Sequence, residues 1–173
     1  MIRILGIGNP LFGDDGVGIS VIAQLWRVEL PEAVEAIDAG TGGLDLLHLM
    51  ADAEQVVLVD AVEMGLAPGA MRWVPVQQVK RDGPPPQLSL HETRVGPLLQ
   101  WLDALGCKVK VQILGIQPAS VRPATGLSPL VEAAVPAAVT EIRRWLKGNC
   151  GLQNADCGLN SGNSQFSNKQ PQR

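Results

Sequence analysis

The chain has 173 residues, of which 46% are hydrophobic and 18% charged, and its formal net charge is −3. This composition is typical of one globular domain with a buried core and excludes an intrinsically disordered chain. The longest basic run is the pair Arg143-Arg144, so the sequence lacks the basic face that nucleic acid or an anionic membrane would need.

The N-terminus and the cysteines both indicate a protein of a reducing compartment. A strand-like run over residues 2–5 begins at once, without the features of a signal peptide. No apolar stretch reaches the roughly 18 residues that span a bilayer. The cysteines, Cys107, Cys150 and Cys157, have neither the even number of a disulfide framework nor the spacing of a zinc site. We therefore expect a soluble, cytoplasmic protein.

Strand-like and helix-like segments alternate along the chain. The expected strands cover residues 2–7, 34–38, 55–60, 69–76 and 109–116. The expected helices cover residues 14–30, 43–50, 91–105 and 129–145. The run Q-V-V-L-V-D at residues 55–60 is typical of a central strand buried on both faces. This alternation predicts an α/β fold, a three-layer sandwich whose twisted, mostly parallel central sheet carries helices on both faces.

The composition changes abruptly after Lys147 to Asn, Gln, Ser and Gly. Such a segment buries too little apolar surface to offset the entropy of ordering it. The sequence therefore predicts one domain over residues 1–147 and a disordered polar tail over residues 148–173.

A glycine-rich segment, G-I-G-N-P-L-F-G-D-D-G-V-G (residues 6–18), leads from the first expected strand into the first helix. A dinucleotide-binding turn occupies this position in many α/β proteins. However, Leu11 replaces the third glycine, and Asp14 and Asp15 would repel a pyrophosphate at the helix N-terminus. Two carboxylates suit a cation better. A simpler alternative is that Asp14 caps the helix and Asp15 interacts with its dipole.

Aspartates follow each of the first three expected strands: Asp15, Asp38 and Asp60. In open α/β sheets the functional crevice lies at the carboxyl ends of the strands. Asp60 is the most informative of the three because it closes an apolar run, although an aspartate there can also cap the following turn.

The two histidines have different surroundings. His48 lies among leucines on a short apolar helix, which favours a packing role, whereas His91 opens a helix after a proline-rich loop, a common location for functional side chains. Asp15, Asp60 and His91 together would offer one nitrogen and two oxygen ligands. That set suits a divalent ion such as nickel or zinc, with positions left open for a substrate.

Five blocks occur in an order that resembles the NiFe-hydrogenase maturation endopeptidases: the segment of residues 6–18, then D-A-G-T-G-G, V-D-A, S-L-H-E-T and G-I-Q-P. The resemblance extends from Met1 to about Trp145. It implies a three-layer α/β fold and an enzyme that removes a C-terminal extension from the hydrogenase large subunit. It also implies metal-contacting roles for Asp15, Asp60 and His91. The loop that it identifies as substrate-contacting contains Asp38, Gly40, Thr41 and Gly42.

Our hypothesis from these residues is a peptidase whose nickel is presented by the substrate protein. Nickel held by cysteines of the large-subunit precursor would dock between Asp15, Asp60 and His91, and either aspartate could serve as the general base. We expect no nucleic acid or membrane partner, and a monomer is adequate for this chemistry. Two alternatives stay open, a nickel-dependent chaperone that binds the precursor without cutting it and a nucleotide-binding module.

Overall fold

A computed structural model describes residues 1–42, 45–75, 102 and 104–149 of the chain. Its strands are β1 (Ile2–Gly6), β2 (Val34–Asp38), β3 (Gln55–Ala61), β4 (Met71–Pro75) and β5 (Lys110–Ile116). Its helices are the 3₁₀ helix η1 (Gly13–Gly16) and the α-helices α1 (Val17–Leu25), α2 (Asp45–Ala51) and α5 (Pro129–Asn149).

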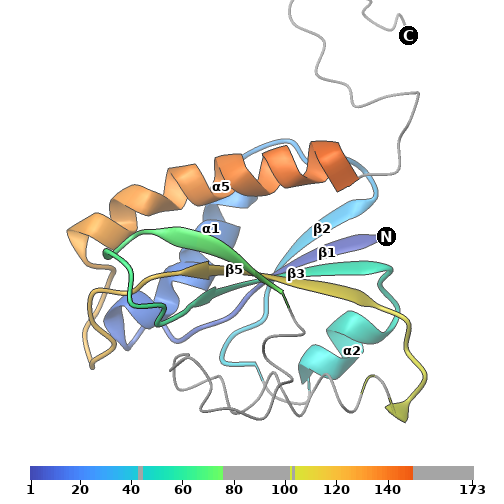
Figure 1. Ribbon diagram of the computed structural model, residues 1–173, viewed down its shortest axis with the longest axis horizontal. Coiled ribbons are helices and arrows are strands. Elements are labelled where there is room, and N and C mark those ends of the chain that lie inside the picture. The colour runs from blue at the N-terminus through green and yellow to red at the C-terminus, as the bar shows by residue number, and fades with distance from the viewer. Residues whose placement is uncertain (43–44, 76–101, 103, 150–173) are drawn as a thin grey trace, which may run out of the picture.

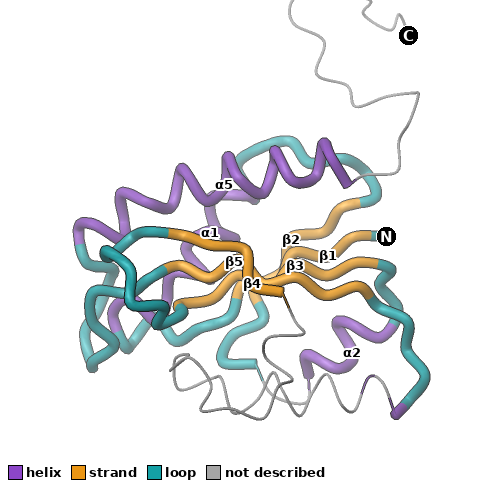
Figure 2. The backbone as a smooth tube through the Cα atoms, in the orientation of Figure 1, coloured by secondary structure: helices purple, strands orange, loops and turns teal. Residues whose placement is uncertain are grey.

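The five strands, orange in Figure 2, form one sheet in the order β2-β1-β3-β5-β4. The first four of these run parallel, and β4 pairs antiparallel with β5 at the edge. In this register Gly6 lies opposite both Asp38 and Val59, and Asp60 lies opposite Gly115. The carboxyl ends of the four parallel strands therefore meet at one edge of the sheet. Asp38, the last residue of β2, and Asp60, near the end of β3, both lie at this edge.

Helices cover both faces of the sheet, with α1 and α5 on one side and α2 on the other (Figure 1). Alternate residues of β3 enter the two cores, because successive side chains of a strand point to opposite faces. Val57 and Val59 pack in the core under α1 and α5, whereas Val56 and Leu58 pack in the core with α2. The prediction of a three-layer α/β fold with a mostly parallel sheet is confirmed.

Two helix boundaries differ from those expected from the pattern. The first helix was expected over residues 14–30, but it consists of η1 followed by α1, which ends at Leu25. The chain turns there toward β2, and the Trp26 indole N–H donates to the Ala36 carbonyl oxygen at 2.8 Å. A proline at position 31 also disfavours helix in the residue before it. At the other end of the domain, α5 continues to Asn149, four residues beyond the expected end of the helix at residue 145 and two beyond the expected domain boundary at residue 147.

Several expectations fall outside the described part of the chain. The expected helix over residues 91–105 is described only at Leu102 and at positions 104–105, and residues 150–173 of the expected tail are not described. Among the described residues, no helix has the length and apolar character needed to cross a membrane.

Candidate active site

The glycine-rich loop brings η1 tightly against the end of β1. Gly8 has a φ of 145°, and a Cβ atom there would lie 1.8 Å from the carbonyl oxygen of Asp15. At Gly18 a Cβ atom would lie 2.3 Å from the carbonyl oxygens of both Ile7 and Val59. Such approaches are possible only for glycine. These two glycines therefore serve the packing of η1 and α1 on the sheet.

The Asp14 carboxylate is an internal anchor. Its side chain is buried, and it accepts four hydrogen bonds from a segment more than 100 positions later in the chain. Oδ2 accepts from the Ala119 N–H at 2.8 Å, the Ser120 N–H at 3.0 Å and the Ser128 hydroxyl at 2.9 Å. Oδ1 accepts from the Ser128 N–H at 2.6 Å. Asp14 thereby fastens the first loop to the segment that precedes α5.

The same contacts determine the charge of Asp14. Burial raises the pKa of this carboxyl, but hydrogen bonds from the backbone of Ser128, Ser120 and Ala119 and from the Ser128 hydroxyl lower it more. The net result is a pKa below the ordinary aspartate value, so Asp14 is ionised at neutral pH. Its carboxylate also lies at the N-terminus of α5, where the helix dipole favours a negative charge.

Asp14 therefore does not have the role that the simpler sequence interpretation gave it. The N-cap of η1 is Phe12, which makes no side-chain capping bond. Asp14 instead interacts with the start of a different helix, α5, and this explains why two consecutive aspartates are present. Asp14 is therefore a structural residue, and the metal-contacting role of Asp15 stays a prediction.

Asp15 is also buried, with an exposed fraction of 1%, and its Oδ2 accepts a hydrogen bond from the Asn9 N–H at 2.8 Å. This bond fixes the side chain relative to the loop that leaves β1. Asp15 belongs to η1, and this element contacts β3.

Asp60 is the third buried carboxylate, after Asp14 and Asp15, with an exposed fraction of 5%. Its Oδ1 accepts a hydrogen bond from the Ala61 N–H at 2.8 Å. Strand alternation places its side chain on the same face as Val56 and Leu58, toward the α2 layer. Directly opposite in β5 is Gly115, and the space that a side chain there would take is occupied by Val62 and Met64.

The loop after β2 closes this edge from the other side. Asp38 is exposed and accepts a hydrogen bond from the Gly40 N–H at 2.8 Å, a common turn arrangement for aspartate. The Gly40 carbonyl oxygen accepts in turn from the Gly8 N–H at 2.9 Å. Thr41 is exposed and Gly42 half-buried. The loop predicted to contact substrate therefore lies directly beside the glycine-rich loop.

His91, the third predicted metal-contacting residue, lies outside the described residues. Among the residues that are described, no group of three or more His, Cys, Asp and Glu side chains is placed to hold a metal ion. Asp15 and Asp60 are the two members of the predicted set that can be located, and both are at the carboxyl edge of the sheet.

Gln117, a buried residue in the G-I-Q-P block, has a role that the sequence interpretation missed. Its carboxamide oxygen accepts from the Met64 and Leu66 N–H groups, and its NH₂ group donates to Glu63 Oε1 and to the Pro118 carbonyl oxygen. These bonds hold the turn that follows Asp60. The position of the block after an apolar strand was the only signal in the sequence.

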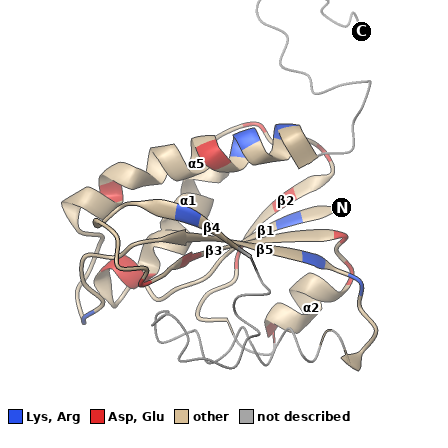
Figure 3. Ribbon diagram, viewed as in Figure 1, with Lys and Arg blue, Asp and Glu red and all other residues tan. Residues whose placement is uncertain are grey.

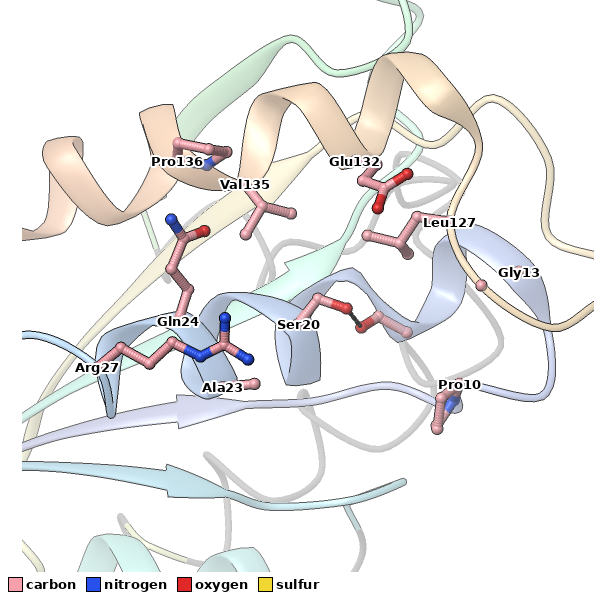
Figure 4. Close-up of a pocket in the computed structure, with 12 residues that line it drawn as sticks. Pro10, Gly13, Ser20, Ala23, Gln24, Arg27, Leu127, Glu132, Val135 and Pro136 are labelled. Carbon is pink, nitrogen blue, oxygen red and sulfur yellow. Dashed lines mark hydrogen bonds between the residues drawn. The ribbon is translucent and has the colours of Figure 1, made fainter.

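A separate groove of about 480 Å³ runs between α1 and α5 (Figure 4). Gln24 lines it from α1 and Arg27 from the chain just after α1, while Glu132 and Val135 line it from α5. One end reaches Pro10 and the glycines of η1, on the side of the first loop away from the α2 layer. Neither Asp15 nor Asp60 is among its lining residues, so the groove is distinct from the predicted site.

The described basic residues are spread over several elements, among them β1, β4, β5 and α5 (Figure 3). Arg3 of β1 is engaged in ion pairs with Glu35 and Asp52. This arrangement agrees with the absence of a basic run in the sequence.

Comparison with known proteins identifies relatives over most of the chain. A family model described as "Hydrogenase maturation protease" matches residues 19–145. The hydrogenase 2 maturation protease of Escherichia coli K12 is 34% identical over 154 residues, covering 84% of this chain and 90% of that protein. The hydrogenase expression/formation protein HupD of Bradyrhizobium diazoefficiens is 34% identical over 119 residues. That match covers 68% of this chain and 62% of HupD, so the chain spans less than two thirds of the length of this relative.

Solved structures give the same result. The hydrogenase maturating endopeptidase HybD from E. coli aligns with a TM-score of 0.73 and 30% identity, covering 85% of this chain and 92% of that one. The hydrogenase 2 maturation peptidase of Thaumarchaeota archaeon SCGC_AB-539-E09 aligns with a TM-score of 0.63 and 33% identity, covering 84% of this chain and 97% of that one.

The fold and these relatives define a peptidase. The chain belongs to the hydrogenase maturation protease family. The family assignment and the α/β fold that the five sequence blocks predicted are both confirmed.

Proposed function

We propose that this peptidase removes the C-terminal extension of a NiFe-hydrogenase large-subunit precursor after nickel has been inserted. In this proposal Asp15, Asp60 and His91 recognise nickel that the precursor carries, and residues 38–42 contact the precursor chain. The enzyme acts in the cytoplasm as a monomer. The observation that supports the proposal best is the pair of buried carboxylates, Asp15 and Asp60, at the carboxyl edge of the sheet.

The chemistry of these two side chains suits a substrate-bound cation. Carboxylate oxygens are good ligands for divalent ions such as nickel. Nickel held by the precursor's cysteines would reach these two carboxylates only when the precursor is docked. Recognition of the metal would then limit cleavage to precursor that has received its nickel.

Hydrolysis requires an activated water near the scissile peptide bond. A carboxylate accepts a proton from the water, the water oxygen adds to the peptide carbonyl carbon, and the C–N bond breaks as the leaving nitrogen takes up a proton. Asp15 and Asp60 are both candidates for this general base. Each is held by a backbone N–H, from Asn9 and Ala61 respectively, which fixes its orientation before substrate arrives.

The experiment is cleavage of a purified nickel-loaded precursor, followed by intact-mass spectrometry. The wild-type chain should release one discrete C-terminal peptide. Asp15→Asn, Asp60→Asn and His91→Ala should each lower the rate by about 100-fold or more, because each removes a metal contact or the base. Asp45→Asn is the matched control, since Asp45 is an exposed carboxylate at the start of α2, and it should cleave like the wild type.

Stable binding of a cognate nickel-loaded precursor without any release of peptide would contradict the proposal and favour a non-cutting chaperone. Full activity in Asp15→Asn or Asp60→Asn would remove those residues from the proposed site.

A further inference from the structure

The Gln117 carboxamide is buried, with an exposed fraction of 3%, and all of its hydrogen-bonding capacity is used. Its Oε1 accepts from the Met64 N–H at 2.7 Å and the Leu66 N–H at 3.2 Å. Its Nε2 donates to Glu63 Oε1 at 2.8 Å and to the Pro118 carbonyl oxygen at 3.1 Å. Because two backbone N–H groups face one end of the carboxamide, that end must be the oxygen. Only glutamine has both an acceptor and a donor end at this length.

Its backbone is fixed as well. The Gln117 N–H donates to the Ala70 carbonyl oxygen at 2.8 Å, and its own carbonyl oxygen accepts from the Gly69 N–H at 2.9 Å. Gln117 therefore joins the end of β5 to both ends of the connection between β3 and β4. The side chain holds the first part of that connection, the turn of residues 63–66, which begins three residues after Asp60.

This turn forms part of the surroundings of Asp60. Gly115 lies opposite Asp60 in the register, so a side chain at Gly115 would point to the same face as the Asp60 carboxylate. A Cβ atom there would lie 2.9 Å from Val62 Cγ2 and 3.4 Å from Met64 Sδ. Val62 and Met64 thus fill the space beside Asp60 that Gly115 leaves open. The Met64 backbone is the group that Gln117 holds with its shortest bond.

We propose that Gln117 is a positioning residue for the peptidase reaction, acting with Glu63 to hold residues 62–66 as the wall beside Asp60. This inference rests on the proposed function of Asp60. The wall fixes where the Asp60 carboxylate lies when nickel-loaded precursor docks, so loosening it lowers the turnover rate of a protein that is still folded.

The pair of Gln117 and Glu63 allows an exchange test. Gln117→Glu would place a second carboxylate against Glu63 and remove the donor to the Pro118 carbonyl oxygen, so the turn should open. In Glu63→Gln, the new carboxamide oxygen can still accept from the Gln117 NH₂ group. In the double variant Gln117→Glu/Glu63→Gln, the carboxylate at 117 still accepts from the Met64 and Leu66 N–H groups, and the carboxamide at 63 donates to it. The NH₂ group at 63 cannot accept from the Gly65 N–H as Glu63 Oε1 does, so the exchange restores only the contact between the two side chains.

The four proteins are compared in precursor cleavage at a temperature well below the lowest Tm among them, with kcat and KM determined separately. Gln117→Glu should lower kcat by about 10- to 100-fold, as expected for a misplaced reactive group. Glu63→Gln should stay within about twofold of wild type, and the double variant should recover part of the loss, because the contact between the two side chains returns while the donor to the Pro118 carbonyl oxygen does not. Gln112→Glu is the matched control, because it makes the same change at an exposed position of β5 and should be neutral.

A purely structural role would lower the Tm of Gln117→Glu and leave kcat unchanged, and that result would overturn the inference. Failure of the double variant to recover activity would also overturn it, since the loss would then not come from the exchange of hydrogen bonds. Failure of the proposed function has a different signature, the absence of cleavage in the wild-type chain itself.

Discussion

Replacing Asp14 by asparagine tests the structural anchor of the site. Asparagine has almost the same shape as aspartate but has one acceptor end and one donor end. With its oxygen in the place of Oδ2 it could still accept from Ala119, Ser120 and the Ser128 hydroxyl. Its NH₂ group would then face the Ser128 N–H, a donor against a donor.

The magnitude follows from these four contacts. Loss of the bond to the Ser128 N–H, with a buried donor left over, costs about 2 kcal/mol. The remaining three bonds change from a charged to a neutral acceptor, at a cost of about 0.7 kcal/mol each. Burying an amide is less costly than burying a carboxylate, which offsets about 1 kcal/mol. The expected loss in the free energy of unfolding is therefore about 3 kcal/mol, or a Tm lower by about 6–12 °C.

Urea unfolding followed by tryptophan fluorescence measures this loss. Ser128→Ala provides the matched control, because it removes only the hydroxyl bond and should cost about 1 kcal/mol. In the Asp14→Asn background the same serine change should cost less, since its partner no longer carries a charge. A loss below about 1 kcal/mol for Asp14→Asn would refute the view that these four bonds anchor the first loop.

Four other results are expected. Gly8→Ala should destabilise the protein by about 2 kcal/mol or more in urea unfolding, because a Cβ atom at Gly8 would clash with the Asp15 carbonyl oxygen. At Gly40 a Cβ atom would meet nothing within 4 Å, so Gly40→Ala should cost only about 1 kcal/mol. Equal losses for the two variants would contradict the close approach of Gly8 to Asp15. Hydrogen bonds from the Trp73 indole and from Arg144 hold the pKa of Glu141 below its ordinary value. The ionised Glu141 therefore stabilises the folded protein at a pH above the ordinary glutamate pKa, and this contribution is lost as the pH falls through the lowered pKa of the folded state. Urea unfolding at about pH 6 and about pH 3 should accordingly show the stability gap between wild type and Glu141→Gln shrinking in acid, and a constant gap would argue against this linkage. Elemental analysis of the purified enzyme should find no stoichiometric tightly bound metal, whereas zinc required for activity would rule out a metal supplied by the substrate. Deletion of residues 150–173 should leave precursor cleavage within about twofold of wild type, and a large loss would assign the tail a role.

The fold could be predicted from the sequence because its strongest signals are local. The continuous apolar run of β3 requires burial on both faces, and a parallel sheet between two helical layers provides it. The position of Asp60 followed directly from the end of that run. The end of α1 could not be predicted from pattern alone, because Val28 and Leu30 are apolar like the helix before them but pack on the core from the irregular chain after α1.

The roles of Asp14 and Gln117 could not be predicted, because both depend on contacts between distant parts of the chain. The partners of Asp14 lie 105 to 114 positions away, and those of Gln117 in the turn after β3 lie 51 to 54 positions away. Nothing in a pair of adjacent aspartates indicates which one turns inward. The sequence identified Asp15 by resemblance, and the structure shows that its neighbour Asp14 is held by bonds to the segment before α5. The role of His91 stays a prediction.

The central claim is that the enzyme recognises nickel on its substrate, and one paired measurement tests it most directly. The same purified large-subunit precursor is prepared with and without nickel, and each form is incubated with the wild-type enzyme and weighed by intact-mass spectrometry over time. The account predicts loss of a single C-terminal peptide from the nickel-loaded form and none from the nickel-free form. Cleavage of both forms at equal rates would contradict it, because Asp15, Asp60 and His91 would then have no nickel to recognise.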